Sequence, residues 1–269
     1  MTDYIAATKA LLDGERLGAV VTVVAGTGIG AKTVIDYELG VVAGSLPDVV
    51  VDDILRDAAE LMEKEQSRTL SYGEVGAFIE VVAPQPVMLI FGAGHNAQPL
   101  TTMAKQLGFR VVVADARPMW ATEDRFPDAD RVIVGWPEAV FSEMPLERRT
   151  YVVLLSHDPR FEDPVFKAVH GQPIRYLGAI GSRRTHRARL ERLAEEGWTE
   201  KELDGIYGPI GLDIGGETPA EMAVSILGEI IQARYGGGTG LSLRGDVGRI
   251  HKPVSYTHLT LPTKVLVCW

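Results

Sequence analysis

Cysteine is almost absent from the sequence, and long apolar runs are absent altogether. The single cysteine, Cys268, excludes an internal disulfide and a metal cluster built from several thiolates. No stretch approaches the roughly 18 apolar residues of a membrane-spanning helix. The acidic, amphipathic start MTDYIAATKALLDGER also lacks the basic residues and apolar core of a secretory signal. We therefore expect a soluble, cytoplasmic protein that does not associate with a membrane.

Basic residues are outnumbered, since the formal net charge is −9 at pH 7. This acidic balance argues against a protein whose main partner is nucleic acid or an anionic membrane surface. Hydrophobic residues make up 46% and charged residues 23% of the chain, which are values typical of a globular protein. The 269 residues allow one large domain or two ordinary ones.

The pattern over residues 1–85 predicts a small α+β domain. We expect helices over 4–12 and 45–65, the second with Ser45 as its cap and Pro47 near its first position, and strands over 19–25, 33–36, 40–43 and 75–82. The two prolines of 83–86 mark a linker. We therefore place a domain boundary there and a second domain over 86–251.

The second domain alternates short apolar strands with helices. Strands are expected over 87–91, 110–115, 131–134, 151–155 and 175–180, with a short helix over 164–169. This alternation predicts a Rossmann-like, doubly wound parallel sheet, in which ligands bind beyond the carboxyl ends of the strands. The final stretch, 252–269, does not fit the pattern. We expect it to be a non-native or disordered tail rather than a C-terminal strand.

A glycine turn joins the first strand of this domain to a helix. Gly92 and Gly94 are followed by the small Ala97, and Asp115 ends the next strand 21 positions after Gly94. Such a turn lets the backbone approach a pyrophosphate, and an acid at that distance holds a ribose. Arg117 could instead accommodate a 2′-phosphate, so NAD and NADP both remain open. The alternative is a purely structural turn.

A basic helix start follows the strand over 175–180. Gly181 ends that strand, Ser182 is a good N-cap, and Arg183 and Arg184 occupy the first helical turn. Positive charge at a helix N-terminus opposes the helix dipole, and a bound anion would remove the conflict. The pattern predicts either an anion site or an outward basic face that pairs with the protein's own carboxylates.

Ser156, His157 and Asp158 come at the end of another strand. Three consecutive residues cannot all point the same way, so a hydrolase triad is excluded here. A His157 base, a ligand contact and a simple loop cap remain open.

A glycine-rich loop precedes the last long helix. Asp213 and Glu217 lie in the segment PIGLDIGGETPAEMA, in which residues 218–221 form a capping box. Both carboxylates are candidates for ligand contact or for capping. No metal site and no catalytic residue are predicted.

Five segments taken together indicate a family. GAGHNA, the DARP run, RFPDAD, GSRR and PIGLDIGGETPAEMAVSILGEII, between about residues 87 and 235, make the chain resemble the xanthine dehydrogenase accessory protein (XdhC-like) family. The resemblance implies a smaller domain before a Rossmann domain. It also implies a homodimeric chaperone, rather than a turnover enzyme, that binds molybdenum cofactor, shelters it during sulfuration and passes it to a molybdenum hydroxylase apoenzyme.

If the ligand is the pterin that this resemblance implies, its phosphate could be held by Gly92, Gly94, His95, Arg183 and Arg184, whose chemistry suits it. Members of the family often carry a GGGC-type segment in the N-terminal half, where this chain reads VVAGSLPD and has no thiol.

Two other functions remain open from the residues alone. The first is an NAD(P)-dependent oxidoreductase with Asp115 on the ribose and His95 or His157 in proton transfer. The second is a protein-interaction module without a ligand.

Overall fold

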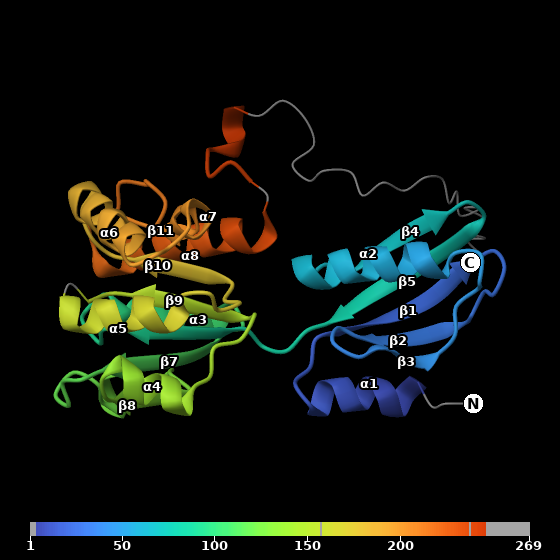
Figure 1. Ribbon diagram of the computed structural model, residues 1–269, viewed down its shortest axis with the longest axis horizontal. Helices are drawn as coiled ribbons and strands as arrows, with labels where there is room; N and C mark the ends of the chain where they lie inside the picture. The colour runs from blue at the N-terminus through green and yellow to red at the C-terminus, as the bar shows by residue number, and fades with distance from the viewer. Residues whose placement is uncertain (1–3, 157, 237, 246–269) are drawn as a thin grey trace, which may run out of the picture. The chain divides into compact units, whose positions relative to one another are not determined.

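The chain forms two compact units, each with its own core (Figure 1). A computed structural model describes residues 4–156, 158–236 and 238–245. The first unit is built mainly from Met1–Pro84, and the second from Gln85–Leu241. His157 and the tail expected over 252–269 lie outside the described residues.

The first unit is an antiparallel sheet with one helix on each face. The strand order is β3-β2-β1-β5-β4, with β1 (Gly18–Ala25), β2 (Lys32–Asp36), β3 (Gly40–Gly44), β4 (Arg68–Tyr72) and β5 (Val75–Val82). Helix α1 (Tyr4–Asp13) buries Leu11 beside Val20 and Val34. Helix α2 (Val51–Lys64) packs Ile54 and Ala58 against the opposite face. The alternation of apolar side chains along β1 therefore divides the core into two layers.

One expectation for the first unit was wrong, and one strand was missed. The helix predicted over 45–65 begins only at Val51, and its N-cap Val50 makes no side-chain cap hydrogen bond. Ser45 and Pro47 precede the helix, so their cap pattern is not used. Strand β4 was not predicted, because it is an edge strand of sequence RTLSY whose side chains are half-buried or exposed and show no alternation.

The second unit contains a six-stranded parallel sheet. Its order is β11-β10-β9-β6-β7-β8, with β6 (Val87–Phe91), β7 (Arg110–Asp115), β8 (Arg131–Val134), β9 (Thr150–Leu154), β10 (Tyr176–Ala179) and β11 (Ile206–Tyr207). The chain moves outward from β6 in one direction, then returns to β9 and moves outward in the other. This is the strand order of a dinucleotide-binding fold, with its switch point between β6 and β9. The predicted fold class is confirmed.

Helices cover both faces of the parallel sheet (Figure 1). Met88 and Ile90 of β6 pack in one apolar cluster with α3 (Ala97–Gln106) and α8 (Pro219–Tyr235). Leu89 and Phe91 pack in the other cluster, with α4 (Pro137–Glu143), α5 (Pro159–Val169) and α6 (Arg183–Glu195). Because β6 is buried on both faces, its sequence VMLIF is apolar throughout.

Several short elements of the second unit were missed or misplaced. Helix α4, helix α7 (Glu200–Asp204) and strand β11 were not predicted. Helix α5 begins at Pro159 rather than at residue 164, and Pro164 lies inside it. A proline in a helix removes one hydrogen bond, but the buried face of α5, which includes Phe161, Val165 and Phe166, outweighs that loss.

Candidate functional site

The glycine turn occupies the switch point of the parallel sheet. Gly92 has φ of 107°, a conformation that favours glycine, and its N–H donates to the Ala114 carbonyl at 2.8 Å. A Cβ on Gly92 would lie 2.9 Å from the backbone nitrogen of Ser156. The chain leaving β6 therefore runs against the chain leaving β9, and only glycine fits between them.

The start of helix α3 faces an open space. A Cβ placed on Gly94 would meet no heavy atom within 4 Å, and the N-cap Asn96 makes no side-chain hydrogen bond to the helix. Ala97 is fully buried, whereas His95 is exposed and meets Trp120 edge-on with ring centroids 5.6 Å apart. The turn is thus accessible to a ligand at Gly94 and His95, and the small Ala97 permits close packing beneath it.

Asp115 accepts four hydrogen bonds at the end of β7. Its Oδ2 accepts from the Ala93 N–H at 2.8 Å and from Arg117 Nη2 at 2.7 Å. Its Oδ1 accepts from Arg117 N at 2.9 Å and Arg117 Nε at 2.8 Å. Burial would raise the pKa of Asp115, but these hydrogen bonds outweigh it and hold the pKa below its usual value. Asp115 therefore fixes the glycine turn as an ionised carboxylate.

Ser156 and Asp158 shape the loop beside the glycine turn. The Ser156 Oγ accepts from the Asp158 N–H at 3.2 Å, and the Asp158 carboxylate caps α5 by accepting from the Arg160 N–H at 3.0 Å. Both side chains therefore have the loop-capping role that the sequence left open. His157, for which a base or a ligand contact was predicted, lies outside the described residues.

The basic start of α6 lies at the same edge of the sheet. Ser182 caps the helix by accepting from the Thr185 N–H at 3.0 Å, as predicted, and Gly181 has φ of 151°. The first turn contains no acidic residue. Arg183 and Arg184 are exposed, and within the part of the chain that the structure describes neither side chain makes a hydrogen bond or an ion pair. Their charge is thus uncompensated at the positive end of the helix.

A buried ion pair anchors α6 to α5. Arg189 donates from Nε and Nη2 to the two oxygens of Glu162, at 2.7 and 3.0 Å, and from Nη2 to the Ile180 carbonyl at 3.0 Å. The side chains of Arg189 and Glu162 are only 1% and 9% exposed. His186 packs one turn earlier, and burial together with the charge of Arg189 lowers its pKa. The arginine fork therefore fixes the loop that precedes Ser182.

The loop before α8 is held at its base and exposed beyond it. Glu229 accepts from the Tyr176 hydroxyl at 2.6 Å and from the Gly211 N–H at 3.0 Å. The predicted capping box at the start of α8 is present. Asp213 and Glu217 are both exposed, and neither carboxylate accepts a hydrogen bond from the described residues.

The spacing of parallel strands sets how far apart these groups lie. The loops after β6, β7 and β9 are neighbours, so Gly92, Asp115 and Ser156 gather at one place. Arg183 and Arg184 follow β10, two strands from β6, or about 10 Å away. The loop that carries Asp213 and Glu217 follows β11 and returns over the end of β10, where the Ile210 N–H donates to the Ala179 carbonyl at 3.1 Å.

Comparison with known proteins identifies the second unit. A family model described as the XdhC Rossmann domain matches residues 88–230, more than half of the chain. The chain belongs to the XdhC family. The resemblance carried by the sequence motifs is therefore confirmed.

Relatives with names extend the comparison. A probable xanthine dehydrogenase subunit of Bacillus subtilis (strain 168) is 33% identical over 191 residues, which cover 71% of this chain and 54% of that protein. The chain thus spans about half the length of this relative. The molybdenum cofactor insertion chaperone PaoD of Escherichia coli (strain K12) is 27% identical over 221 residues, which cover 66% of this chain and 70% of PaoD.

A solved structure shares the fold. The crystal structure of a xanthine dehydrogenase from Bacillus halodurans superposes with a TM-score of 0.51 at 19% sequence identity, and the match covers 87% of this chain and 94% of that one. At this identity the similarity shows the fold alone.

Sequence reasoning missed two residues of the XdhC Rossmann domain that lie beside the glycine turn, Arg125 and Trp120. Arg125 donates from Nη1 to the Ala93 carbonyl at 2.9 Å and to the Trp120 carbonyl at 2.6 Å. Its guanidinium lies over the Trp120 ring, 4.6 Å from the centroid, and that of Arg117 lies 5.0 Å from the same centroid. Arg125 is 32 positions from Ala93, so no local pattern could reveal the contact. Arg125 itself is the first residue of the RFPDAD segment.

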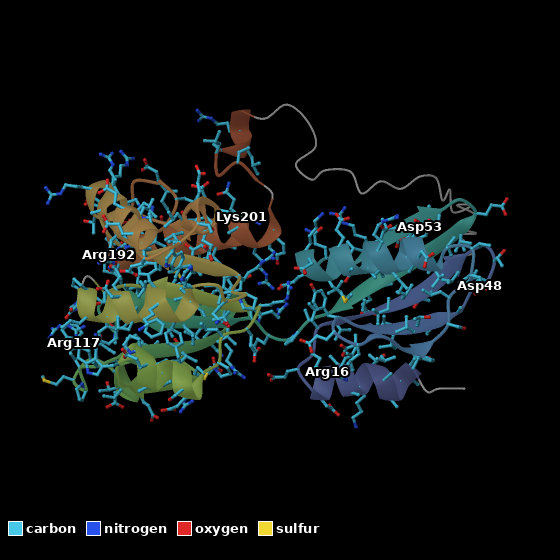
Figure 2. All side chains as sticks on the ribbon, in the orientation of Figure 1. Arg16, Asp48, Asp53, Arg117, Arg192 and Lys201 are labelled. Atoms are coloured by element: carbon cyan, nitrogen blue, oxygen red, sulfur yellow. The ribbon has the colours of Figure 1, made fainter. Side chains whose placement is uncertain are left out.

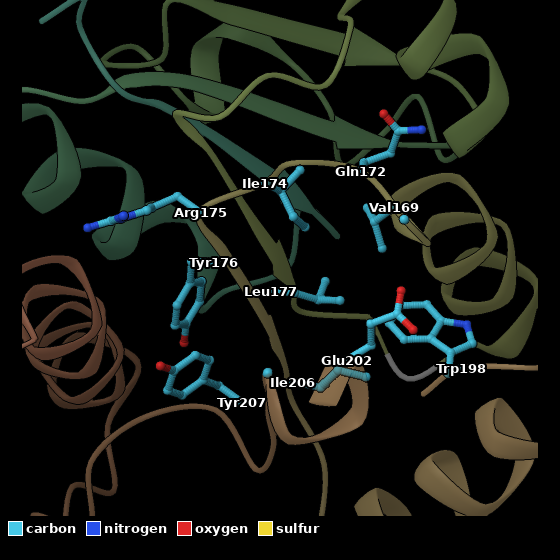
Figure 3. A pocket seen from close by; sticks show the side chains of 12 residues that line it. Val169, Gln172, Ile174, Arg175, Tyr176, Leu177, Trp198, Glu202, Ile206 and Tyr207 are labelled. Carbon is cyan, nitrogen blue, oxygen red and sulfur yellow. The ribbon is translucent and has the colours of Figure 1, made fainter. Parts of the chain in front are cut away.

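A separate groove lies at the opposite edge of the sheet (Figure 3). It encloses about 310 Å³ near the amino-terminal ends of β10 and β11, and its walls include Trp198, Glu202 and Tyr207. The XdhC motif residues are not part of its lining. Among the described residues, no group of three or more His, Cys, Asp and Glu side chains could hold a metal ion, and no helix could span a membrane.

Proposed function

We propose that this protein binds molybdenum cofactor at the carboxyl edge of its parallel sheet and delivers it to a molybdenum hydroxylase apoenzyme of the xanthine dehydrogenase type. Membership of the XdhC family and similarity to a named molybdenum cofactor insertion chaperone support this role. It is a chaperone of a cofactor rather than a turnover enzyme.

One observation carries the proposal: an open glycine turn and an uncompensated pair of arginines lie at the same edge. Gly94 leaves the turn accessible, and Arg183 and Arg184 have no acidic partner among the described residues. Each arginine opposes the dipole of α6 by about 0.3 to 1 kcal/mol. A phosphate-bearing ligand removes this conflict, and the protein as a whole is acidic, so the basic patch is local.

The residues present fit the phosphate of a pterin cofactor. The backbone N–H groups of Gly94 and His95 would hold the phosphate, since those of Gly92 and Ala93 already donate to the Ala114 carbonyl and to Asp115. Arg183 and Arg184 would reach it from about 10 Å away, two strands across the sheet. Asp213 and Glu217 complete the edge as candidates for the hydrogen-bonding groups of the pterin. The bound cofactor would supply the metal centre of the acceptor enzyme. Since the single cysteine is Cys268, we propose no thiolate ligand from the motif region.

Cofactor retention tests the proposal. The chain is purified from a host that makes molybdenum cofactor, and the pterin is quantified per protein after oxidation to its fluorescent form. We expect retention by the wild type and a loss of at least about tenfold in the Arg183→Ala/Arg184→Ala double variant, since two charged contacts are removed. A Lys167→Ala/Lys201→Ala variant, with the same change of charge elsewhere on the second unit, should retain the cofactor. Absence of pterin from the wild type, or equal retention by the arginine variant, would refute the role.

The oxidoreductase alternative gains no support from the geometry. It requires Asp115 to accept hydrogen bonds from the hydroxyl groups of a ribose, whereas each oxygen of Asp115 already accepts two hydrogen bonds.

We also propose a cytoplasmic homodimer, an expectation that derives from the family resemblance. Sedimentation velocity on the purified protein checks the dimer. Co-purification with an apo-hydroxylase, but not with its cofactor-loaded form, checks the partner.

A further inference from the structure

The acid expected to hold a ribose is closed off in this protein. Asp115 stands at the end of the second strand of the βαβ unit, where a nucleotide-binding Rossmann domain places the acid that accepts the ribose hydroxyls. Here the side chain is 2% exposed. To bind a ribose diol, a carboxylate needs an accessible oxygen with a free acceptor position. Asp115 is buried, and its four hydrogen bonds occupy the acceptor positions of both oxygens.

The side chain of Arg117 blocks access to the Asp115 carboxylate. The guanidinium donates through Nε and Nη2 to the two oxygens of Asp115, in the bidentate geometry that suits a carboxylate. The other side of Arg117 is open, since its side chain is 58% exposed (Figure 2). Its position over Trp120 fixes the plane of the fork. Arg117 therefore stands between the carboxylate and solvent.

Arg117 retains donors for a ligand. An arginine has five N–H bonds, and Asp115 takes two of those on Arg117, so the outward edge of the guanidinium remains available for an anion. Asp115 also accepts from the Ala93 N–H of the glycine turn at 2.8 Å, so Arg117 lies beside that turn.

We infer that Arg117 is a specificity-determining residue of this edge, which excludes a nucleotide ribose from Asp115 and offers a phosphate the outer face of its guanidinium. Asp115 is then a positioning residue for Arg117 and the glycine turn, and does not contact the ligand. The inference deepens the proposed function and rests on it for the place of the ligand. It selects phosphorylated ligands that carry no ribose at the position of Asp115.

The chain supplies a matched control at the start of α5, after β9. Asp158 and Arg160 repeat the spacing of Asp115 and Arg117, and Asp158 accepts from Arg160 N, Nε and Nη2 at 3.0, 3.0 and 2.7 Å. This pair is exposed, with side-chain exposures of 36% for Asp158 and 77% for Arg160. Removal of Arg160 therefore changes the charge equally without opening a buried acid.

Calorimetric titration of the intact chain with ADP-ribose and NADH tests the exclusion. We expect no binding by the wild type or by Arg160→Ala up to about 1 mM nucleotide. Arg117→Ala leaves each oxygen of Asp115 with one backbone donor and one free acceptor position, so it should bind ADP-ribose at least about tenfold more tightly. Arg117→Lys, which cannot form the fork, should show a smaller gain. Titration with inorganic pyrophosphate should show weaker binding by Arg117→Ala than by the wild type and Arg160→Ala.

The outcomes separate the inference from the proposed function. The inference is overturned if the wild type binds ADP-ribose as tightly as Arg117→Ala, if the folded Arg117 variants gain no nucleotide affinity, or if pyrophosphate binding is unchanged. Should Arg117→Ala not fold, Arg117→Lys decides. A wild type that retains no molybdenum cofactor, together with a gain of ADP-ribose binding by the variant, refutes the proposed function and leaves the exclusion standing.

Discussion

Single carboxylates hold the loops of the candidate site, and they do so at different depths. Asp115 and Glu162 are buried and accept from arginine forks, whereas Asp158 makes the same kind of contact near the surface. A buried ionised group depends fully on its partners, because water cannot replace them, whereas an exposed pair is screened. The energetic weight of each pair should therefore follow its burial.

Substitution of Asp115 by asparagine should be costly. The amide keeps the shape but loses the charge, and it turns an N–H group toward one of the donors that now face Asp115. We expect the free energy of unfolding to fall by about 2 to 3 kcal/mol. The exposed Asp158→Asn should lower it much less, because water screens that pair and asparagine can still cap α5. Urea denaturation followed by circular dichroism measures both values, and equal losses in the two variants would contradict the assigned depth.

The stability contribution of Asp115 should depend on pH. Because the native pKa is lowered, the ionised form stabilises the fold above the unfolded pKa of about 3.9, and this contribution disappears as the pH falls through the native pKa. The difference in unfolding free energy between wild type and Asp115→Asn should thus be constant from pH 7 to about 5 and shrink on further acidification. Urea denaturation at a series of pH values checks this. A difference that grows toward acid pH would show that Asp115 has a raised pKa.

At the scale of elements, the α5–α6 contact holds the basic helix start in place. Glu162→Gln leaves the buried guanidinium of Arg189 without its counter-charge, so the free energy of unfolding should fall by about 3 to 5 kcal/mol. The neighbouring Asp163 pairs with Arg192 at the surface, and Asp163→Asn should cost less than about 1 kcal/mol. Thermal and urea denaturation measure the pair of variants. A mild effect of Glu162→Gln would mean that packing alone positions α6.

The two glycines of the turn between β6 and α3 have different roles: Gly92 is needed for the fold, whereas Gly94 is accessible. Gly92→Ala places a Cβ 2.9 Å from the Ser156 nitrogen at a positive φ, and it should cost about 2 to 4 kcal/mol. Gly94→Ala meets no neighbour and should change stability by less than about 1 kcal/mol. If a phosphate approaches this backbone, Gly94→Ala should nevertheless reduce cofactor retention by at least about tenfold. Full retention by a stable Gly94→Ala protein would place the ligand elsewhere.

Elements with a strong local pattern could be predicted from the sequence, and the others could not. β6, β8 and the capping box of α8 follow directly from apolar runs and cap residues. Helix α7 and strand β11 have five and two residues, too few for periodicity to identify them. The same limit applies to the site. Gly92 and Ser182 have local motifs, whereas the support of Arg125 for the turn depends on folding across 32 positions.

The division of the whole molecule into two units bears on where function resides. All thirteen residues predicted for the site, from Gly92 to Glu217, belong to the second unit. Its two apolar clusters lie on the two faces of the parallel sheet, and the first unit has apolar clusters of its own. We propose that each unit is a domain and that the second contains the complete ligand site.

Limited proteolysis and a fragment test this division. Gln85 is exposed, but Pro86 is buried and its carbonyl accepts from the Arg110 N–H at 2.8 Å, so cleavage should occur within 83–85 and leave the second unit intact. A fragment of residues 85–241 should unfold in one cooperative transition. It should also retain molybdenum cofactor to within about threefold of the full chain, since a complete site loses no contact. Mass spectrometry of the digest, thermal denaturation and pterin quantification provide the measurements. A folded fragment that loses the cofactor would show that the first unit contributes ligand contacts. Gly44 and Ser45 of the VVAGSLPD segment would then be the next residues to substitute.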